Sequence, residues 1–203
     1  MIELLTNFII ALIKATGYPG VFLLMTLESA LIPIPSEATM PFAGSLVAFG
    51  TFNFWWLVII GTAGNLLGSV LAYGLGYLGE NEVASFIRRY GKYVLIREKE
   101  FQHARVLFKR FGEPIVFLSR ILPAVRTYIS LPAGIAKMDF KKFLIYTCLG
   151  SFIWSAVLTY LGMMLRNNWH VITPYFHILD ILVIGSMILG VGYFLQAKLS
   201  KRT

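Results

Sequence analysis

Two stretches of the chain, residues 51–79 and 143–165, contain no charged residue at all. A membrane-spanning helix needs about 20 predominantly apolar residues, so both stretches are predicted to cross a bilayer. Residues 172–197 are predicted to form a third span, with Asp180 near one end. The chain of 203 residues is 57% hydrophobic and only 14% charged, whereas about 25% charged is usual for a soluble domain. We therefore predict one all-α integral membrane domain over residues 1–203.

The basic residues are grouped between the apolar stretches rather than spread along the chain. Residues 80–110 hold eight of the 18 lysines and arginines, interleaved with apolar side chains, which predicts amphipathic helices on a membrane surface. If this connector is cytoplasmic, 14 of the 18 basic residues, including those of the C-terminal tail, fall on that side. The positive-inside rule therefore predicts a multi-pass protein of the cell membrane, the cytoplasmic membrane if the source is bacterial, with residues 80–110 and the C-terminus in the cytoplasm. The side of the N-terminus stays open.

Two further apolar segments, 17–50 and 112–134, are interrupted by residues that end helices. The residues predicted to form the breaks are Pro33, Pro35 and Ser36 in the first segment and Pro123 and Gly134 in the second. Proline removes a backbone donor, which leaves half-helices of roughly 10–16 residues, or about 15–24 Å. These lengths are short of the roughly 30 Å hydrocarbon core. We predict that each segment is a re-entrant hairpin enclosed by protein or by a water-filled cavity. Two kinked spanning helices are the alternative.

The two broken segments are related in sequence. KATGYPGVFL (14–23) matches KRFGEPIVFL (109–118) at six of ten positions, and the spans that follow share Phe, Gly and Ser residues at a constant spacing of 86. This order predicts a duplication, with repeat one at 17–79 and repeat two at 112–165. A hairpin crosses the membrane zero times and a span crosses once. The repeats are therefore predicted to be inverted about the surface connector 80–110, an arrangement typical of secondary transporters.

The charged residues inside the apolar segments are the candidates for function, because a charge at membrane depth is costly and usually faces a partner or a cavity. Arg120 and Arg126 flank the sequence ILPAV. Arginine stays protonated and presents a planar fork that binds phosphate oxygens at two points. We predict that the two arginines bind the phosphate of an anionic lipid. The alternative is that they form structural ion pairs with Glu28 or Glu37, and the two roles can coexist.

Glu37 follows the break PIPS directly, and Ser36 or Ser29 could cap the half-helix that begins there. A carboxylate at this position gains from the helix dipole and from an arginine opposite, while desolvation favours its neutral form. Glu37 is therefore the candidate proton-coupling residue, against a purely structural lock. Glu28 carries a similar but weaker claim to either role.

Residues that would carry enzymatic or metal chemistry are not found in a recognisable pattern. His103, His170 and His177 lie far apart and have no metal-ligand spacing. A membrane lipid phosphatase would need a histidine nucleophile, yet the first histidine after Arg120 is His170, and no G-x-S-x-G turn occurs for a serine nucleophile. We expect no enzymatic activity, no cofactor and no metal. The net charge of +8 fits a membrane surface better than nucleic acid.

Two regions resemble a known family. ESALIPIPSEATMPFAGSL (28–46) and FLSRILPAVRTYISLPAGIAKMDFKKF (117–143) are similar to the two signature regions of the DedA family, also called the SNARE-associated or VTT-domain family. The resemblance covers residues 17 to about 164. It implies paired re-entrant hairpins in an inverted repeat.

The resemblance also implies lipid translocation. Bacterial members of the family recycle undecaprenyl phosphate or move phospholipids across the cytoplasmic membrane, and eukaryotic relatives scramble phospholipids. The residues implied to function are Glu37, Arg120 and Arg126. Some proton-dependent members carry a further acidic residue just after the first hairpin, but residues 46–56 contain none, and Asn53 is the nearest polar group.

These observations predict a flippase or carrier that moves undecaprenyl phosphate, with its phosphate on the two arginines and its tail in the lipid. A phosphatidylethanolamine flippase or scramblase is the alternative, because both lipids carry a phosphate. A membrane structural or assembly factor is the alternative from another class, in which the ion pairs only hold the fold. The lipid, the coupling ion and the oligomeric state are left open.

Overall fold

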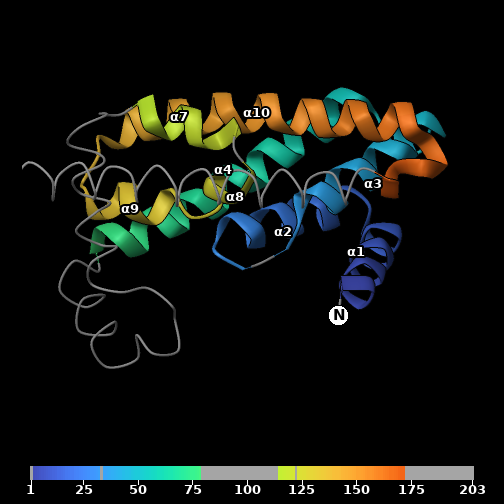
Figure 1. The fold of residues 1–203 in the computed structure, drawn as a ribbon, viewed down its shortest axis with the longest axis horizontal. Coiled ribbons are helices and arrows are strands. Elements are labelled where there is room, and N and C mark those ends of the chain that lie inside the picture. Colours follow the sequence, from blue (N-terminus) through green and yellow to red (C-terminus); the bar gives the residue numbers. More distant parts are fainter. Residues whose placement is uncertain (1, 33, 79–113, 122, 172–203) are drawn as a thin grey trace, which may run out of the picture.

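The computed structural model describes residues 2–32, 34–78, 114–121 and 123–171 (Figure 1). Within these ranges the regular elements are helices and none is a strand, which confirms the predicted all-α class for this part of the chain. Their bounds are α1 Ile2–Thr16, α2 Tyr18–Ser29, α3 Ser36–Ala48, α4 Phe54–Leu78, α7 Pro114–Ile121, α8 Pro123–Arg126, α9 Ser130–Ile135, α10 Phe140–Leu165 and the 3-10 helix η1 Arg166–Val171. The connector 80–110 and the predicted span 172–197 lie outside the described residues.

Among the described helices, α4 and α10 are long and apolar enough to cross a membrane. Their 25 and 26 residues correspond to about 38 Å at 1.5 Å per residue, which exceeds the roughly 30 Å hydrocarbon core. Both begin at a polar residue that caps them. The side chain of Asn53 accepts hydrogen bonds from the amides of Trp55 and Trp56, and the side chain of Asp139 accepts one from the amide of Lys142. These caps explain why α4 begins after the predicted residue 51 and α10 before the predicted residue 143.

The outer faces of α4 and α10 are covered with large apolar side chains, as a helix surrounded by lipid requires. The exposed ones are Trp55, Trp56, Ile59, Leu67, Leu71, Leu75, Tyr77 and Leu78 on α4 and Phe140, Ile145, Leu149, Phe152, Ile153, Val157, Tyr160 and Met164 on α10. Soluble proteins rarely expose so large a contiguous apolar surface.

The two long helices lie side by side and antiparallel. Gly61, near the start of α4, lies against Ser155 in the second half of α10. Tyr73, near the end of α4, lies against Phe143 at the start of α10, with 4.6 Å between the ring centroids. Figure 1 shows α10 running along the long axis of the molecule, with α7 beside it and α4 and α9 close by. The shorter helices pack against this central pair.

The first broken segment forms an antiparallel pair of short helices, α2 and α3. At one end, the ring of Tyr18 in α2 lies 4.6 Å from that of Phe52, which follows α3. At the other end, the first amide of α3, that of Ser36, lies beside Glu28 near the end of α2. The 12 and 13 residues of the two helices correspond to about 18–20 Å, as predicted for half-helices.

The second broken segment is divided more finely than predicted. It contains three helices of 8, 4 and 6 residues instead of two longer halves. Pro123 is the first residue of α8, where a proline is tolerated because its missing amide would have no partner in any case. Gly134 was predicted to mark a break, and this prediction is wrong. It lies inside α9, where the lack of a side chain lets the helix approach the backbone of Tyr73 in α4.

Two apolar cores lie at opposite ends of the bundle. The first joins α1, α2 and α3 to the start of α4 and the end of α10, and its fully buried members include Ile9, Leu24, Met40, Leu57 and Leu158. The second joins α7 and α9 to the end of α4 and the start of α10, around Tyr73, Val116, Ala133 and Phe143. The charged side chains of the two broken segments meet between these cores.

The close packing of α2 on α4 gives a direct test of this fold. A Cβ atom at Gly68 would collide with the backbone carbonyl of Thr26, whereas a Cβ atom at Gly74 on the same helix would meet nothing within 4 Å. We expect Gly68→Ala to destabilise the protein by about 1–3 kcal/mol, a drop in melting temperature of roughly 2–10 °C in detergent. Gly74→Ala is the matched control and should leave the melting temperature unchanged or slightly higher. Equal effects of the two substitutions would contradict the packing of α2 on α4.

Candidate functional site: a buried cluster of arginines and carboxylates

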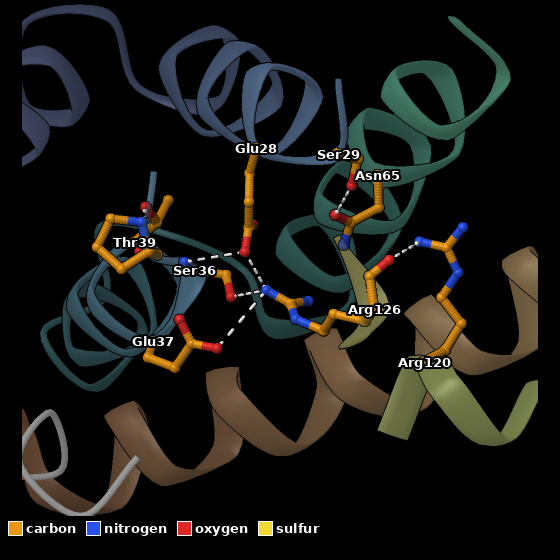
Figure 2. Close-up of polar contacts among 9 residues, drawn as sticks. Glu28, Ser29, Ser36, Glu37, Thr39, Asn65, Arg120 and Arg126 are labelled. Atoms are coloured by element: carbon orange, nitrogen blue, oxygen red, sulfur yellow. Dashed lines mark hydrogen bonds and ion pairs between the residues drawn. The ribbon is translucent and has the colours of Figure 1, made fainter. Parts of the chain in front are cut away.

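Arg126, at the end of α8, lies at the centre of the cluster and is only 4% exposed. Its Nη2 atom donates hydrogen bonds to Oε1 of Glu28 and to Oγ of Ser36. The same atom lies 3.7 Å from Oε1 of Glu37. Figure 2 shows the guanidinium between the end of α2 and the start of α3, facing both carboxylates. One arginine of the second broken segment therefore holds both ends of the break in the first segment.

Glu28 also caps the N-terminus of α3. Its Oε1 atom accepts a hydrogen bond from the amide of Ser36, at 3.3 Å. The prediction that a serine caps this helix is wrong, because Pro35 occupies the cap position and provides no side-chain hydrogen bond. The Ser36 hydroxyl accepts from Arg126, and the Ser29 hydroxyl donates to Oδ1 of Asn65 at 2.7 Å. A carboxylate near the first amides of a helix is favoured by the helix dipole.

The predicted breaks of the first segment frame this cap. Pro35 directly precedes α3 with φ of −77°, and Ser36 is the first residue of the helix. Leu31, in the same turn, has φ of +73°, an uncommon value for a residue with a branched side chain. Pro33 lies outside the described residues. The turn therefore brings Glu28 and Ser36 together although eight positions separate them.

An aromatic residue that the sequence reasoning missed completes the surroundings of Arg126. The guanidinium carbon lies 5.1 Å from the ring centroid of Trp154 on α10. A cation over a tryptophan face gains from the ring quadrupole, and the gain grows where water is excluded. Nothing in the sequence around Trp154 distinguishes it from the other residues of the charge-free stretch 143–165. Its contact with Arg126 is seen only in the structure, where α10 faces α8.

Arg120, at the end of α7, has a different environment although it is equally buried, at 3% exposed. Its Nη1 atom donates to the backbone carbonyl of Arg126 at 2.9 Å. Its Nη2 atom donates to the hydroxyl of Ser130 at 2.6 Å and lies 3.4 Å from that of Thr147. Within the described part of the chain, its hydrogen-bond partners are neutral oxygens and no carboxylate forms a salt bridge with it. The two arginines are neighbours, but their guanidinium groups bind different partners in this structure.

Several buried polar atoms of the cluster have no hydrogen-bond partner among the described residues. They are Oε2 of Glu28, Nε of Arg120 and Nε of Arg126. Buried polar groups are paired in the great majority of cases, and an unpaired charged group is especially costly. The cluster therefore has donors left for a further acceptor, and no carboxylate among the described residues forms a salt bridge with Arg120. Such an arrangement can bind an anion with several oxygens.

No group of three or more His, Cys, Asp or Glu side chains among the described residues could hold a metal ion. His103 and His177 lie outside those residues, as does the basic connector 80–110.

Comparison with known proteins places the chain in a family. Residues 32–164 match the VTT domain. This range includes α3, α4, α7 to α9, α10 except for its last residue, and both arginines, and it covers more than half of the chain. The chain belongs to the VTT-domain family, also called the DedA family, which confirms the resemblance found in its sequence.

Some relatives of the chain have names that suggest an activity, and these names are of two kinds. It is 35% identical to "Undecaprenyl phosphate transporter A" of Bacillus subtilis (strain 168), over 75% of this chain and 74% of that protein. It is 30% identical to the protein of the same name from Staphylococcus aureus, over 100% and 98% of the two chains. It is also 34% identical to an "Alkaline phosphatase-like protein" of Lactococcus lactis subsp. cremoris, over 93% and 88%. No solved structure matches the chain.

The two carboxylates are expected to differ in their contribution to stability. Glu28→Gln removes the direct partner of a buried arginine, and breaking such a pair typically costs about 3–5 kcal/mol. Glu37 lies farther from Arg126, at 3.7 Å, and Glu37→Gln leaves the contact between Arg126 and Glu28 in place, so it should cost less than Glu28→Gln. Melting temperatures followed by tryptophan fluorescence in detergent would measure both. Equal shifts, or a larger shift for Glu37→Gln, would contradict the assigned contacts.

Proposed function

We propose that the chain is a membrane carrier that moves undecaprenyl phosphate from one leaflet to the other, as the names of its relatives suggest. The observation that carries the proposal is Arg120, a buried cation with neutral hydrogen-bond partners in the described structure. A buried charge without a partner is unfavourable, so such a side chain is retained where it serves a function. The phosphate of the lipid would be its counter-ion, and the polyprenyl tail would stay in the surrounding lipid.

The proposed architecture is an inverted repeat of two re-entrant hairpins, α2–α3 and α7–α9, each followed by a span. One set of contacts that supports it concerns each hairpin and the span that follows. A Cβ atom at Gly64 in α4 would meet the side chain of Met25 in α2, and a Cβ atom at Gly150 in α10 would meet that of Arg120 in α7. The sequence repeat aligns Gly64 with Gly150 and Met25 with Arg120. Equivalent residues of the two repeats thus make equivalent contacts.

Contacts between each hairpin and the span of the other repeat support the same architecture. Gly44 in α3 lies against the backbone of Thr159 in α10, and Gly134 in α9 lies against the backbone of Tyr73 in α4. The repeat aligns Gly44 with Gly134, and the constant spacing of 86 relates Tyr73 to Thr159. Exchanging the repeats therefore maps one interface onto the other, as an approximate two-fold axis in the membrane plane would do.

In the proposed cycle, the lipid phosphate first meets Arg120 and then competes with Glu28 and Glu37 for Arg126. If the phosphate takes Arg126, two carboxylates at membrane depth lose their cation. Proton uptake by one of them would then offset the cost, because burial disfavours an unpaired carboxylate. Release of the lipid would follow when the ionised carboxylates reclaim Arg126. This is how Glu37 or Glu28 could couple transport to protons.

The proposed orientation places residues 80–110 and the C-terminus in the cytoplasm of a bacterial cell, because most basic residues would then lie on that side.

A phosphatidylethanolamine flippase would use the same arginines, since its substrate also carries a phosphate. The alkaline phosphatase-like name of one relative suggests hydrolysis, for which the sequence provides no recognisable nucleophile. An assembly factor would need the ion pairs for the fold alone.

The substitution Arg120→Met separates transport from a structural role. Methionine occupies the aligned position 25 of repeat one, and replacing a buried charge by an apolar side chain of similar size is often neutral or stabilising. We expect the variant to keep its melting temperature and to lose lipid transport about tenfold or more, because a hydrogen bond to a charged group contributes roughly 1.5–3 kcal/mol. The assay follows fluorescent undecaprenyl phosphate in proteoliposomes by its accessibility to an external quencher. A purely structural role predicts the reverse, a lower melting temperature with transport intact in the folded fraction.

Arg126→Lys keeps the charge and loses the planar fork, so it should also reduce transport in the same assay.

Fluorescent phosphatidylethanolamine, tested in separate vesicles, shows which of the two lipids is carried. Release of inorganic phosphate from undecaprenyl phosphate would indicate that the protein is a phosphatase. If neither lipid moves faster than in empty vesicles, the carrier proposal fails.

A further inference from the structure

The interface between α4 and α10 is apolar at both ends and polar in the middle. Gly61 lies against Ser155 and Tyr73 against Phe143, and this antiparallel register holds over twelve positions of α4. Steps of four residues keep to one face of a helix. The register therefore places Asn65 opposite Ser151 and Ser69 opposite Thr147, in the central part of both helices.

The central layer is polar and fully enclosed. Its members are Asn65 and Ser69 on α4 and Thr147, Ser151 and Ser155 on α10, and each is at most 3% exposed. Apolar residues close the layer at both ends, with Val58 and Leu158 on one side and Tyr73 and Phe143 on the other. Small hydroxyl residues and asparagine are common where helices pack in lipid, because they allow close approach and form hydrogen bonds between the helices. The informative feature of this layer is therefore which of its polar atoms have no such bond.

Three polar atoms of this layer lack a hydrogen-bond partner among the described residues. They are Nδ2 of Asn65, Oγ of Ser69 and Oγ of Ser155. A serine in an apolar helix normally bonds to the carbonyl four residues earlier, as Thr62 does with Val58 at 2.7 Å. Ser69 and Ser155 have the same opportunity and do not use it. Their hydroxyl groups are therefore available to a small polar ligand inside the bundle.

We propose that this layer is an internal hydration chamber, in which ordered water molecules bond to Asn65, Ser69 and Ser155. Buried water typically bonds to about three otherwise unpaired polar groups, and the layer supplies such groups. Ser29 joins the chamber to the arginine cluster, because it donates to Asn65 and directly follows Glu28 in the chain (Figure 2). The chamber would supply water to Glu28 from within the protein. It does not depend on which lipid is carried, or on transport at all.

The test is the chemical reactivity of a thiol placed in the chamber. Ser69→Cys and Ser155→Cys would be made separately in a Cys148→Ala background and purified into lipid vesicles. The reagent is methyl methanethiosulfonate, which is small and neutral, crosses lipid and reacts with the thiolate. A thiol ionises readily only where water or a charge stabilises the thiolate.

Two cysteines at dry positions are the matched controls. Val58→Cys lies in the fully buried apolar layer, and Leu71→Cys, 51% exposed, lies on the outer face of α4. We expect both chamber cysteines to react at least about tenfold faster than either control, because only a hydrated thiol ionises appreciably. Reaction no faster than that of Val58→Cys would overturn the proposal. Transport in the same preparations is measured separately, so that loss of the carrier function and a dry chamber are distinguishable.

The wild-type protein gives an answer that does not depend on the folding of cysteine variants. Met40 is fully buried, and its side chain lies beside Gly61 next to the chamber. Short X-ray exposure produces hydroxyl radicals from bound water, and mass spectrometry detects the oxidised side chains. Oxidation of Met40 is expected if water occupies the chamber. Absence of oxidation at Met40, with exposed methionines such as Met164 oxidised, would overturn the proposal.

Discussion

The buried contact between Arg126 and Glu28 is the interaction on which the rest of the site depends. It joins positions 98 residues apart, one from each broken segment. The same carboxylate also binds the first amide of α3, so the pair fixes the turn between α2 and α3 as well. Neither charge could remain buried alone without a large desolvation cost. The two apolar cores on either side of the pair fix its geometry.

Much of this arrangement follows from the sequence, and the reason is the cost of polar groups in lipid. The charge-free stretches predict α4 and α10 closely, and the rare charges inside apolar segments predict Glu28, Glu37, Arg120 and Arg126 as site residues. Other features escape prediction because they depend on which way a helix faces. Trp154, Asn65 and Ser155 do not disturb the apolar pattern around them, and only the packing of the helices shows that they lie beside Arg126, Ser29 and Gly61 respectively. The short helices α7 to α9 are set by tertiary contacts, such as that of Gly134 with Tyr73, rather than by proline positions alone.

The two arginines illustrate how one residue type takes two roles in neighbouring environments. Arg126 has a carboxylate in direct contact, a second within 4 Å and an aromatic face, so it holds the two segments together. Arg120 donates to hydroxyl groups and a carbonyl, and among the described residues no carboxylate forms a salt bridge with it and its Nε has no partner. Met25, which the proposed sequence repeat aligns with Arg120, belongs to the apolar core. The proposed function would account for this difference between the two aligned positions, because only position 120 would have to bind an anion.

The central claim is that the buried arginines bind a phosphate carried by an apolar tail. The most direct test is the melting temperature of the purified protein with farnesyl phosphate, a short soluble analogue, compared with farnesol, which has the same tail without the phosphate. At about 100 times its dissociation constant, a ligand specific for the folded state adds roughly 2.7 kcal/mol, or about 5–10 °C for a chain of this size. The account predicts this rise with farnesyl phosphate alone, and its loss in the Arg120→Met variant. Equal shifts with farnesol, or an undiminished shift in Arg120→Met, would contradict it.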